Sequence, residues 1–210
     1  MEGYRPETYG DRIADVYDAM MADLPDPTDS VDRLAELAGP GPALELGIGT
    51  GRVALPLAAR GVQVHGVDAS EAMVGRLRAK PGGEAVPVTL GDFAGVPVEG
   101  DYRLVYVVFN TFFALLTQDA QVRCFAGVAR RLAPGGAFVL QDFQHVVLAE
   151  GGVRLHPGAI RYAWPSELDL MARLAGLRLR ERWGGWRREP FGADSPLHVS
   201  VYEHAEGAAS

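Results

Sequence analysis

The chain has 210 residues, of which 48% are hydrophobic and 22% charged, and its formal charge is −7. This length is enough to bury a layered core, so we expect one domain spanning residues 1–210. A single cysteine, Cys124, excludes an internal disulfide, and we expect its thiol to be buried in a helix. No apolar run is long enough for a membrane helix, and the N-terminus lacks the basic start and apolar stretch of a signal peptide, which predicts a cytoplasmic protein with no membrane partner. The negative charge and scattered arginines argue against nucleic acid as a partner and favour a small-molecule ligand.

The first quarter of the chain predicts two helices followed by a strand and a glycine-rich turn. Residues 9–21 and 30–37 have helical periodicity. Residues 43–46 form a short apolar run that predicts a strand, and the glycine turn 47–51 follows. The next helix should end at Arg60, because the basic last turn is followed at once by a glycine.

The alternation of apolar runs and amphipathic stretches then continues to residue 143, which is typical of a parallel sheet wrapped by helices. Ser70 is suited to cap a helix, and the continuous run from Tyr102 to Val108 predicts a central strand buried on both faces. Right-handed crossovers between such units leave a ligand crevice at the carboxyl ends of the strands. The expected strands are 62–67, 86–90, 102–108 and 137–143, and the expected helices are 70–80 and 118–132.

The last third of the chain has a different pattern. Residues 144–162 alternate around a Glu-Gly-Gly turn and predict a β-hairpin, and Pro165 opens a helix to residue 174. Two further strands follow at 177–183 and 197–204. We therefore predict an α/β fold: a Rossmann-like, doubly wound, seven-stranded sheet, mostly parallel with an antiparallel last strand, and a small hairpin cap. Its expected parts are N-terminal helices (9–38), a core (40–143), the cap (144–162), and a last helix with a strand pair (163–204).

Three polar features at strand ends indicate a nucleoside-containing ligand. The segment Glu45–Gly51 reads Glu-Leu-Gly-Ile-Gly-Thr-Gly, and its glycines permit positive φ and let a ligand contact the backbone. Asp68 ends the second strand, 17 residues after Gly51, where a carboxylate can accept both ribose hydroxyls. Gly91–Phe93 ends the third strand and supplies a carboxylate and an aromatic face for an adenine.

These segments, together with Gly66–Met73 and Leu132–Gly136, resemble the ordered motifs of class I S-adenosylmethionine-dependent methyltransferases across residues 9–143. The resemblance implies that S-adenosylmethionine is converted to S-adenosylhomocysteine. It also implies roles for individual residues: Glu45, Gly47, Gly49 and Gly51 for the methionine part, Asp68 for the ribose, Ala69, Met73, Asp92 and Phe93 for the adenine, and Phe109 and Asn110 near the sulfonium and the acceptor. Tyr9 and Tyr17 occupy positions where such enzymes close over the cofactor, although packing alone would equally explain tyrosines in an amphipathic helix.

Methyl transfer from a sulfonium is an in-line displacement, so alignment and exclusion of water supply most of the acceleration. A base is needed only when the acceptor starts protonated. His145 and His156 on the predicted hairpin are candidate bases, with Asp142 orienting them, although a histidine on a strand face more often serves packing. Members of the family with similar Phe-Asn-Thr-Phe and Arg-Tyr-Ala-Trp-Pro segments carry a longer antiparallel insertion after strand five. In this chain Phe143 runs directly into Gln144, so either the cap is trimmed or residues are absent between these two positions.

Two other functions compete with methyl transfer. A nicotinamide-dependent oxidoreductase shares the sheet and the ribose carboxylate, but its fingerprint requires a third glycine where this chain has Arg52. A cofactor-binding sensor or an inactive partner subunit would keep the binding motifs without turnover. Aromatic residues near the crevice favour a lipophilic acceptor such as a secondary metabolite, although strand and helix packing would use the same residues: Phe109, Phe112, Phe113, Tyr162 and Trp164. The hairpin would then roof the acceptor pocket, or it would only pack against the sheet.

Overall fold

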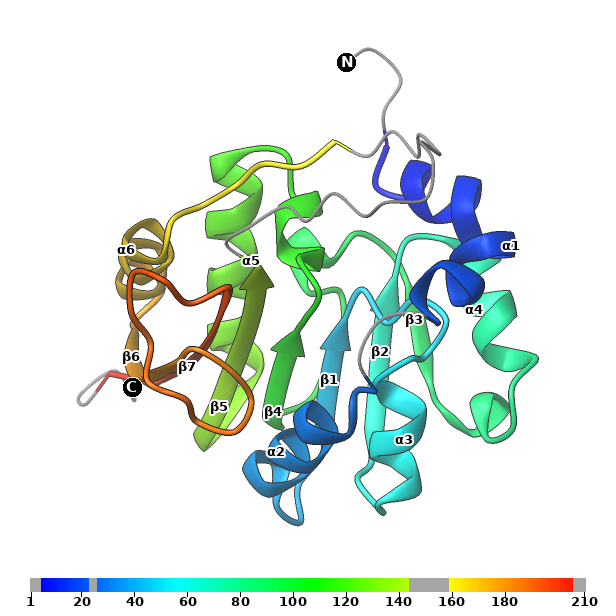
Figure 1. Cartoon of the computed structure of the whole chain (residues 1–210), viewed down its shortest axis with the longest axis horizontal. Helices are drawn as coiled ribbons and strands as arrows, with labels where there is room; N and C mark the ends of the chain where they lie inside the picture. Colours follow the sequence, from blue (N-terminus) through cyan, green and yellow to red (C-terminus); the bar gives the residue numbers. More distant parts are fainter. Residues whose placement is uncertain (1–4, 23–25, 144–158, 206–210) are drawn as a thin grey trace.

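The computed structural model describes residues 5–22, 26–143 and 159–205, and its centre is a single seven-stranded sheet (Figure 1). The strand order is β3-β2-β1-β4-β5-β7-β6. β1 pairs in parallel with β2 and β4, and β7 runs antiparallel to both β5 and β6. The strands are β1 (Ala43–Leu46), β2 (Val64–Asp68), β3 (Val88–Leu90), β4 (Tyr102–Val107), β5 (Leu132–Phe143), β6 (Leu177–Trp183) and β7 (Leu197–His204).

Helices cover both faces of the sheet. Leu34 and Leu57 pack against the central strands on one face, and Phe125 and Met171 pack against them on the other. All four side chains are almost inaccessible to solvent. None of the helices in the described ranges is long and apolar enough to cross a membrane. The helices are α1 (Thr8–Met21), α2 (Thr28–Ala38), α3 (Ala54–Ala59), α4 (Glu71–Arg78), α5 (Gln118–Arg131) and α6 (Pro165–Leu174), with short 3-10 helices η1 (Gly83–Ala85), η2 (Phe93–Gly95) and η3 (Thr111–Ala114).

The predicted fold class is confirmed: the sheet is Rossmann-like and mostly parallel, with an antiparallel end. Two local signals that predicted the starts of helices are also confirmed. Ser70 Oγ accepts a hydrogen bond from Met73 N at 3.1 Å and caps α4, and Pro165 occupies the first turn of α6, where a missing amide donor costs nothing. The buried thiol of Cys124 lies in α5, as expected from its apolar pattern.

Strand β5 is longer than predicted, because the Pro-Gly-Gly turn before it is part of the strand. Leu132 pairs with Tyr102 of β4, and the register shifts before the next pair, Leu104 with Ala137. A turn was predicted because proline and glycine disfavour regular strands, but pairing at the edge of β4 draws these residues into the sheet. The expected hairpin lies mainly in residues 144–158, outside the described residues, and residues 159–162 contain no strand.

Candidate functional site

A cavity of about 300 Å³ is lined by residues of α1 and by residues at the carboxyl ends of β1, β2 and β3. In an open, doubly wound sheet this edge is where ligands bind. The structure brings most of the residues predicted to hold the cofactor together in its wall: Tyr9, Tyr17, Gly47, Gly49, Asp68, Ala69, Met73, Asp92 and Phe93.

The glycine turn after β1 forms the floor of the cavity. Gly47 and Gly49 have φ values of 71° and 55°, which disfavour any other residue. A Cβ on Gly47 would lie 2.3 Å from Thr111 Cγ2, so this glycine allows η3 to approach the turn. Among the described residues, no atom beyond the chain neighbours of Gly49 lies within 4 Å of a Cβ built on this glycine, which lines the cavity. The open side of Gly49 thus leaves room for a ligand against the backbone.

Asp68 connects the end of β2 to the glycine turn. Its Oδ2 accepts a hydrogen bond from Gly49 N at 2.7 Å, and its Oδ1 accepts one from Ser70 N at 2.9 Å. Burial raises the pKa of Asp68, against the effect of these amide bonds. A carboxylate has about four acceptor positions, and the backbone amides do not use all of them, so Asp68 can still accept from a donor in the cavity. The geometry fits a pair of ribose hydroxyls.

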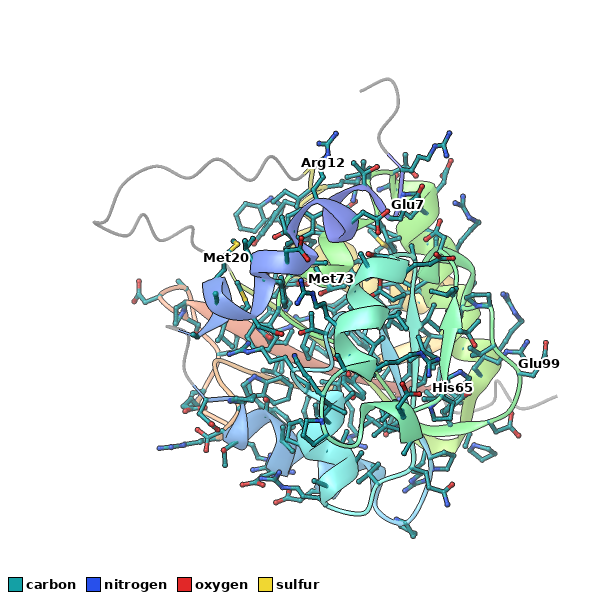
Figure 2. All side chains as sticks on the ribbon, turned by 90° about the vertical axis from the view of Figure 1, so that its right-hand side faces the viewer. Glu7, Arg12, Met20, His65, Met73 and Glu99 are labelled. Atoms are coloured by element: carbon teal, nitrogen blue, oxygen red, sulfur yellow. The ribbon has the colours of Figure 1, made fainter. Side chains whose placement is uncertain are left out.

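A second carboxylate and two apolar side chains stand at the ends of β3 and α4. Asp92 Oδ1 accepts a hydrogen bond from Ala94 N at 2.9 Å, which leaves Oδ2 available. Phe93 is 8% exposed and Met73 is 4% exposed, and both line the cavity. Figure 2 shows Met73 at the junction of α1 and α4. A flat apolar slot with an acceptor at its rim is suited to an adenine.

Helix α1 covers the cavity with Tyr9 and Tyr17. Burial, together with the neighbouring Tyr9, raises the pKa of Tyr17 to about 12, so its hydroxyl stays protonated. Three aspartates of α1, spaced along one side, join the helix to α4 and to the glycine turn. The contacts are Asp11 with Ser70 Oγ (2.6 Å), Asp15 with Arg76, and Asp18 with Thr50 Oγ1 (2.6 Å) and Lys80 Nζ (2.8 Å).

Two residues predicted to hold the cofactor lie behind the cavity wall. Glu45 is 4% exposed and accepts a hydrogen bond from Tyr106 Oη at 2.8 Å; burial raises its pKa to about 8. The Gly51 position faces Leu55 and Leu77, which a Cβ would approach to 3.0 and 3.1 Å. Both residues therefore support the glycine turn from below, and neither is part of the cavity wall.

The loop after β4 stands beside the cavity. Phe109 and Asn110 both have positive φ, at 58° and 61°, a conformation that is strained for residues other than glycine. Gln141 of β5 stabilises it, because its Oε1 accepts a hydrogen bond from Phe109 N at 2.9 Å. The guanidinium of Arg52 lies 4.2 Å from the centre of the Phe109 ring. Sequence reasoning missed Gln141, and its one signal was a polar residue inside an apolar strand.

Of the three predicted catalytic residues, the described part of the chain includes only Asp142. His145 and His156 lie outside the described residues, so their role stays a prediction. Asp142 is 1% exposed at the end of β5, and neither of its carboxyl oxygens has a hydrogen-bond partner in the described part of the chain. Burial raises its pKa well above the ordinary value.

The cavity also includes residues that sequence reasoning missed. Thr111 follows the Phe-Asn pair directly, and proximity to that motif was the one available signal for it. The others come from segments whose position depends on the packing of α1 and α5 against the sheet. They are Arg5, Pro6, Gly10, Ala114, Leu115, Leu116, Thr117 and Ala120, together with the cap residue Ser70.

A doubly wound sheet with a glycine turn after β1 and a carboxylate at the end of β2 defines a protein that binds a nucleoside-containing cofactor. Comparison with known proteins identifies the cofactor class. Residues 43–136 match a family model described as a methyltransferase domain. The CcbJ methyltransferase from Streptomyces caelestis superposes with a TM-score of 0.87 at 41% identity, over 96% of this chain and 100% of that one.

Other similarities agree. The cypemycin N-terminal methyltransferase of a Streptomyces species is 28% identical over 200 residues, covering 76% of this chain and 82% of the relative. The glycopeptide N-methyltransferase MtfA, in complex with S-adenosylmethionine, has the same fold, with a TM-score of 0.67 at 16% identity over 87% of this chain and 96% of that one. The chain belongs to the class I S-adenosylmethionine-dependent methyltransferases. Its cofactor is S-adenosylmethionine, and the nicotinamide alternative is thereby excluded.

Proposed function

We propose that the protein transfers the methyl group of S-adenosylmethionine to a small molecule of the secondary-metabolite type. The observation that carries this proposal is the cavity, where acceptors for ribose and adenine, Asp68 and Asp92, flank a glycine turn that exposes its backbone. The names of the similar proteins support the acceptor class, because they include a cypemycin and a glycopeptide N-methyltransferase.

In this proposal each group in the wall has a separate task. The glycine turn contacts the methionine part of the cofactor through its backbone, Asp68 receives the ribose hydroxyls, and Asp92 with Phe93 holds the adenine. Tyr9 and Tyr17 of α1 exclude water, which favours displacement at a sulfonium. Bound S-adenosylmethionine supplies an electrophilic methyl group. The chain itself has to align the acceptor with that group.

The acceptor would enter from the side of β4 and β5, because the cofactor cavity takes up the ends of β1 to β3. On that side the ring centres of Phe113 and Tyr162 lie 4.8 Å apart with the rings tilted by 48°, and Tyr162 meets Trp164 edge to face at 5.0 Å between ring centres. Trp164 is 64% exposed, which leaves its ring accessible. An aromatic edge of this kind is suited to a lipophilic small molecule.

Two measurements test the proposal. Calorimetry should detect binding of S-adenosylhomocysteine and none of NAD. Incubation with S-adenosylmethionine and a panel of small natural products, followed by mass spectrometry, should give products heavier by one methyl group. Cofactor binding without any methylated product would instead favour a sensor or an inactive partner subunit.

The ribose assignment is tested with Asp68→Asn, which keeps one acceptor for the turn and removes the charge. Charge-assisted hydrogen bonds contribute about 1.5–3 kcal/mol each, and water replaces part of this, so we expect S-adenosylhomocysteine to bind about 10- to 100-fold more weakly. The matched control is Asp101→Asn, an exposed carboxylate that precedes β4 at the opposite edge of the sheet. Equal affinity of the two variants would remove Asp68 from the site.

A further inference from the structure

Unpartnered polar atoms gather at the carboxyl end of β5. Within the described ranges, both carboxyl oxygens of Asp142, Nε2 of Gln141, Nε2 of His198 and the hydroxyl of Tyr162 are buried and lack a hydrogen-bond partner. Buried polar groups are almost always paired, and each exception needs a cause. Several exceptions at one strand end, on the side where the acceptor would enter, suggest a site for a polar ligand.

The sheet register places Asp142 next to His198. The two residues are paired across β5 and β7, so their side chains share a face, the one that carries α5 and α6. They are 1% and 0% exposed. Gln141 points to the opposite face, where its other amide atom binds Phe109 N. Asp142 and His198 therefore belong to one group, whereas Gln141 lies on the other face of the sheet and holds the loop after β4.

Tyr162 completes this group from the segment that leads into α6. Figure 1 shows that segment, in yellow, running along the carboxyl side of the sheet. Burial raises the pKa of Tyr162, and the negative charge of Asp142 raises it further, as expected for two groups in one neighbourhood. We call Asp142, Tyr162 and His198 the β5 polar group.

A rigid network orients His198. Its Nδ1 lies 3.0 Å from Ser200 Oγ, which accepts a hydrogen bond from Arg182 Nε at 2.9 Å. Arg182 in turn binds both carboxyl oxygens of Asp169 on α6. Burial and the charge of Arg182 lower the pKa of His198 to about 4, so the imidazole is neutral near pH 7. His198 consequently offers Asp142 no counter-charge.

Asp142 lacks a cationic partner on every described side. His198 lies opposite Asp142 on β7, neither carboxyl oxygen has a hydrogen-bond partner among the described residues, and burial raises the pKa of Asp142. Removing a carboxylate from water without a partner is costly, and a cationic ligand would offset that cost. A hydroxyl ligand would supply a hydrogen bond but no charge.

We propose that Asp142 binds and deprotonates an amine acceptor, with Tyr162 and His198 forming the rest of the polar wall. This inference rests on the proposed methyl transfer. The acceptor enters as an ammonium ion, and one proton moves from nitrogen to a carboxyl oxygen of Asp142. The freed lone pair forms the N–C bond to the methyl group as the C–S bond breaks and its electron pair stays on sulfur. A carboxyl that titrates nearer neutrality than an ordinary aspartate is better matched to this task.

The test uses Asp142→Asn, which has the same shape but accepts no proton, with Asp101→Asn as the matched control. The probes are N-methylbenzylamine and piperidine, each paired with a hydroxyl counterpart, benzyl alcohol and cyclohexanol. With S-adenosylhomocysteine present, calorimetry on the wild type should show at least tenfold tighter binding of the amines than of the alcohols. Asp142→Asn should lose this preference while binding S-adenosylhomocysteine as well as the control does.

Methyl transfer to the amines at pH 7 should fall about 100-fold in Asp142→Asn, the usual contribution of a general base. The deficit should narrow as the pH approaches the pKa of the amine in solution, because an unprotonated amine needs no base. An amine preference that persists in Asp142→Asn, no amine preference in the wild type, or an unaltered pH profile would overturn the inference. Methylation of hydroxyl probes alone would overturn the inference and leave the proposed function standing, whereas cofactor binding with no methylated product from any acceptor would overturn both.

Discussion

Gly49 combines a left-handed backbone with a side that is open to the cavity. Alanine at this position would incur about 1–2 kcal/mol of backbone strain and would place a methyl group in the space for the cofactor. We predict that Gly49→Ala weakens binding of S-adenosylhomocysteine at least 100-fold in calorimetry, while circular dichroism shows a folded protein.

Gly61, which follows α3, provides the matched control. Its φ is 88° and no atom of the described residues beyond its chain neighbours lies within 4 Å of its built Cβ, but Gly61 is exposed outside the cavity. Gly61→Ala should therefore lose a similar amount of stability and keep its cofactor affinity. If both variants bind S-adenosylhomocysteine equally, the glycine turn does not contact the cofactor.

At the scale of single elements, polar contacts of three aspartates attach α1 to α4 and to the glycine turn, beside the apolar contacts of the helix. Hydrogen bonds from Lys80 and Thr50 hold the pKa of Asp18 below its ordinary value, although partial burial opposes them. We predict that Asp18→Asn weakens S-adenosylhomocysteine binding about three- to tenfold, because α1 is then less firmly held over the cavity.

Asp15→Asn is the comparison for this prediction. The contact of Asp15 with Arg76 is much more exposed, and exposed ion pairs contribute about 0–1 kcal/mol. The affinity of the Asp15→Asn variant for S-adenosylhomocysteine should stay within about twofold of the wild-type value. A titration in which both variants match the wild type would mean that the apolar contacts of Ile13, Ala14 and Met73 hold α1 by themselves.

At the scale of the whole molecule, the buried carboxyl groups determine how the free energy of unfolding depends on pH. Burial raises the pKa of Asp142 well above its ordinary value and that of Glu45 to about 8. The folded state then binds more protons than the unfolded state above about pH 4, so stability falls as the pH rises towards the folded pKa values. We expect the cofactor-free protein to lose stability between about pH 4.5 and pH 8.

Asp142→Asn isolates the contribution of one of these acids. The variant should unfold in urea with about 1–3 kcal/mol more stability than the wild type at pH 7.5, because it removes an unpaired buried charge. The difference should shrink as the pH falls and vanish below about pH 3, where the wild-type carboxyl is protonated in both states. A variant less stable than the wild type at pH 7.5 would show that Asp142 is paired within the protein.

The positions of the elements and of the cofactor motifs followed from the sequence. Alternating periodicities and local signals such as Ser70 and Pro165 depend on residues close together in the chain, which is why β1, β6, β7 and α6 have their predicted bounds. The carboxyl ends of parallel strands share one edge of the sheet, so Asp68 and Asp92 were expected to meet there, and both line the cavity.

Only the tertiary structure decided which polar residues face the cavity and which are buried behind it. Glu45 and Gly51 lie in the same motif as Gly49, but the path of the strand directs Glu45 to Tyr106 and packs Gly51 against Leu77. The packing of α1 likewise decided that Tyr9 and Tyr17 line the cavity. The neighbourhood of Asp142 depends on an antiparallel pairing with His198, 56 residues away, and no local pattern encodes a contact over that distance.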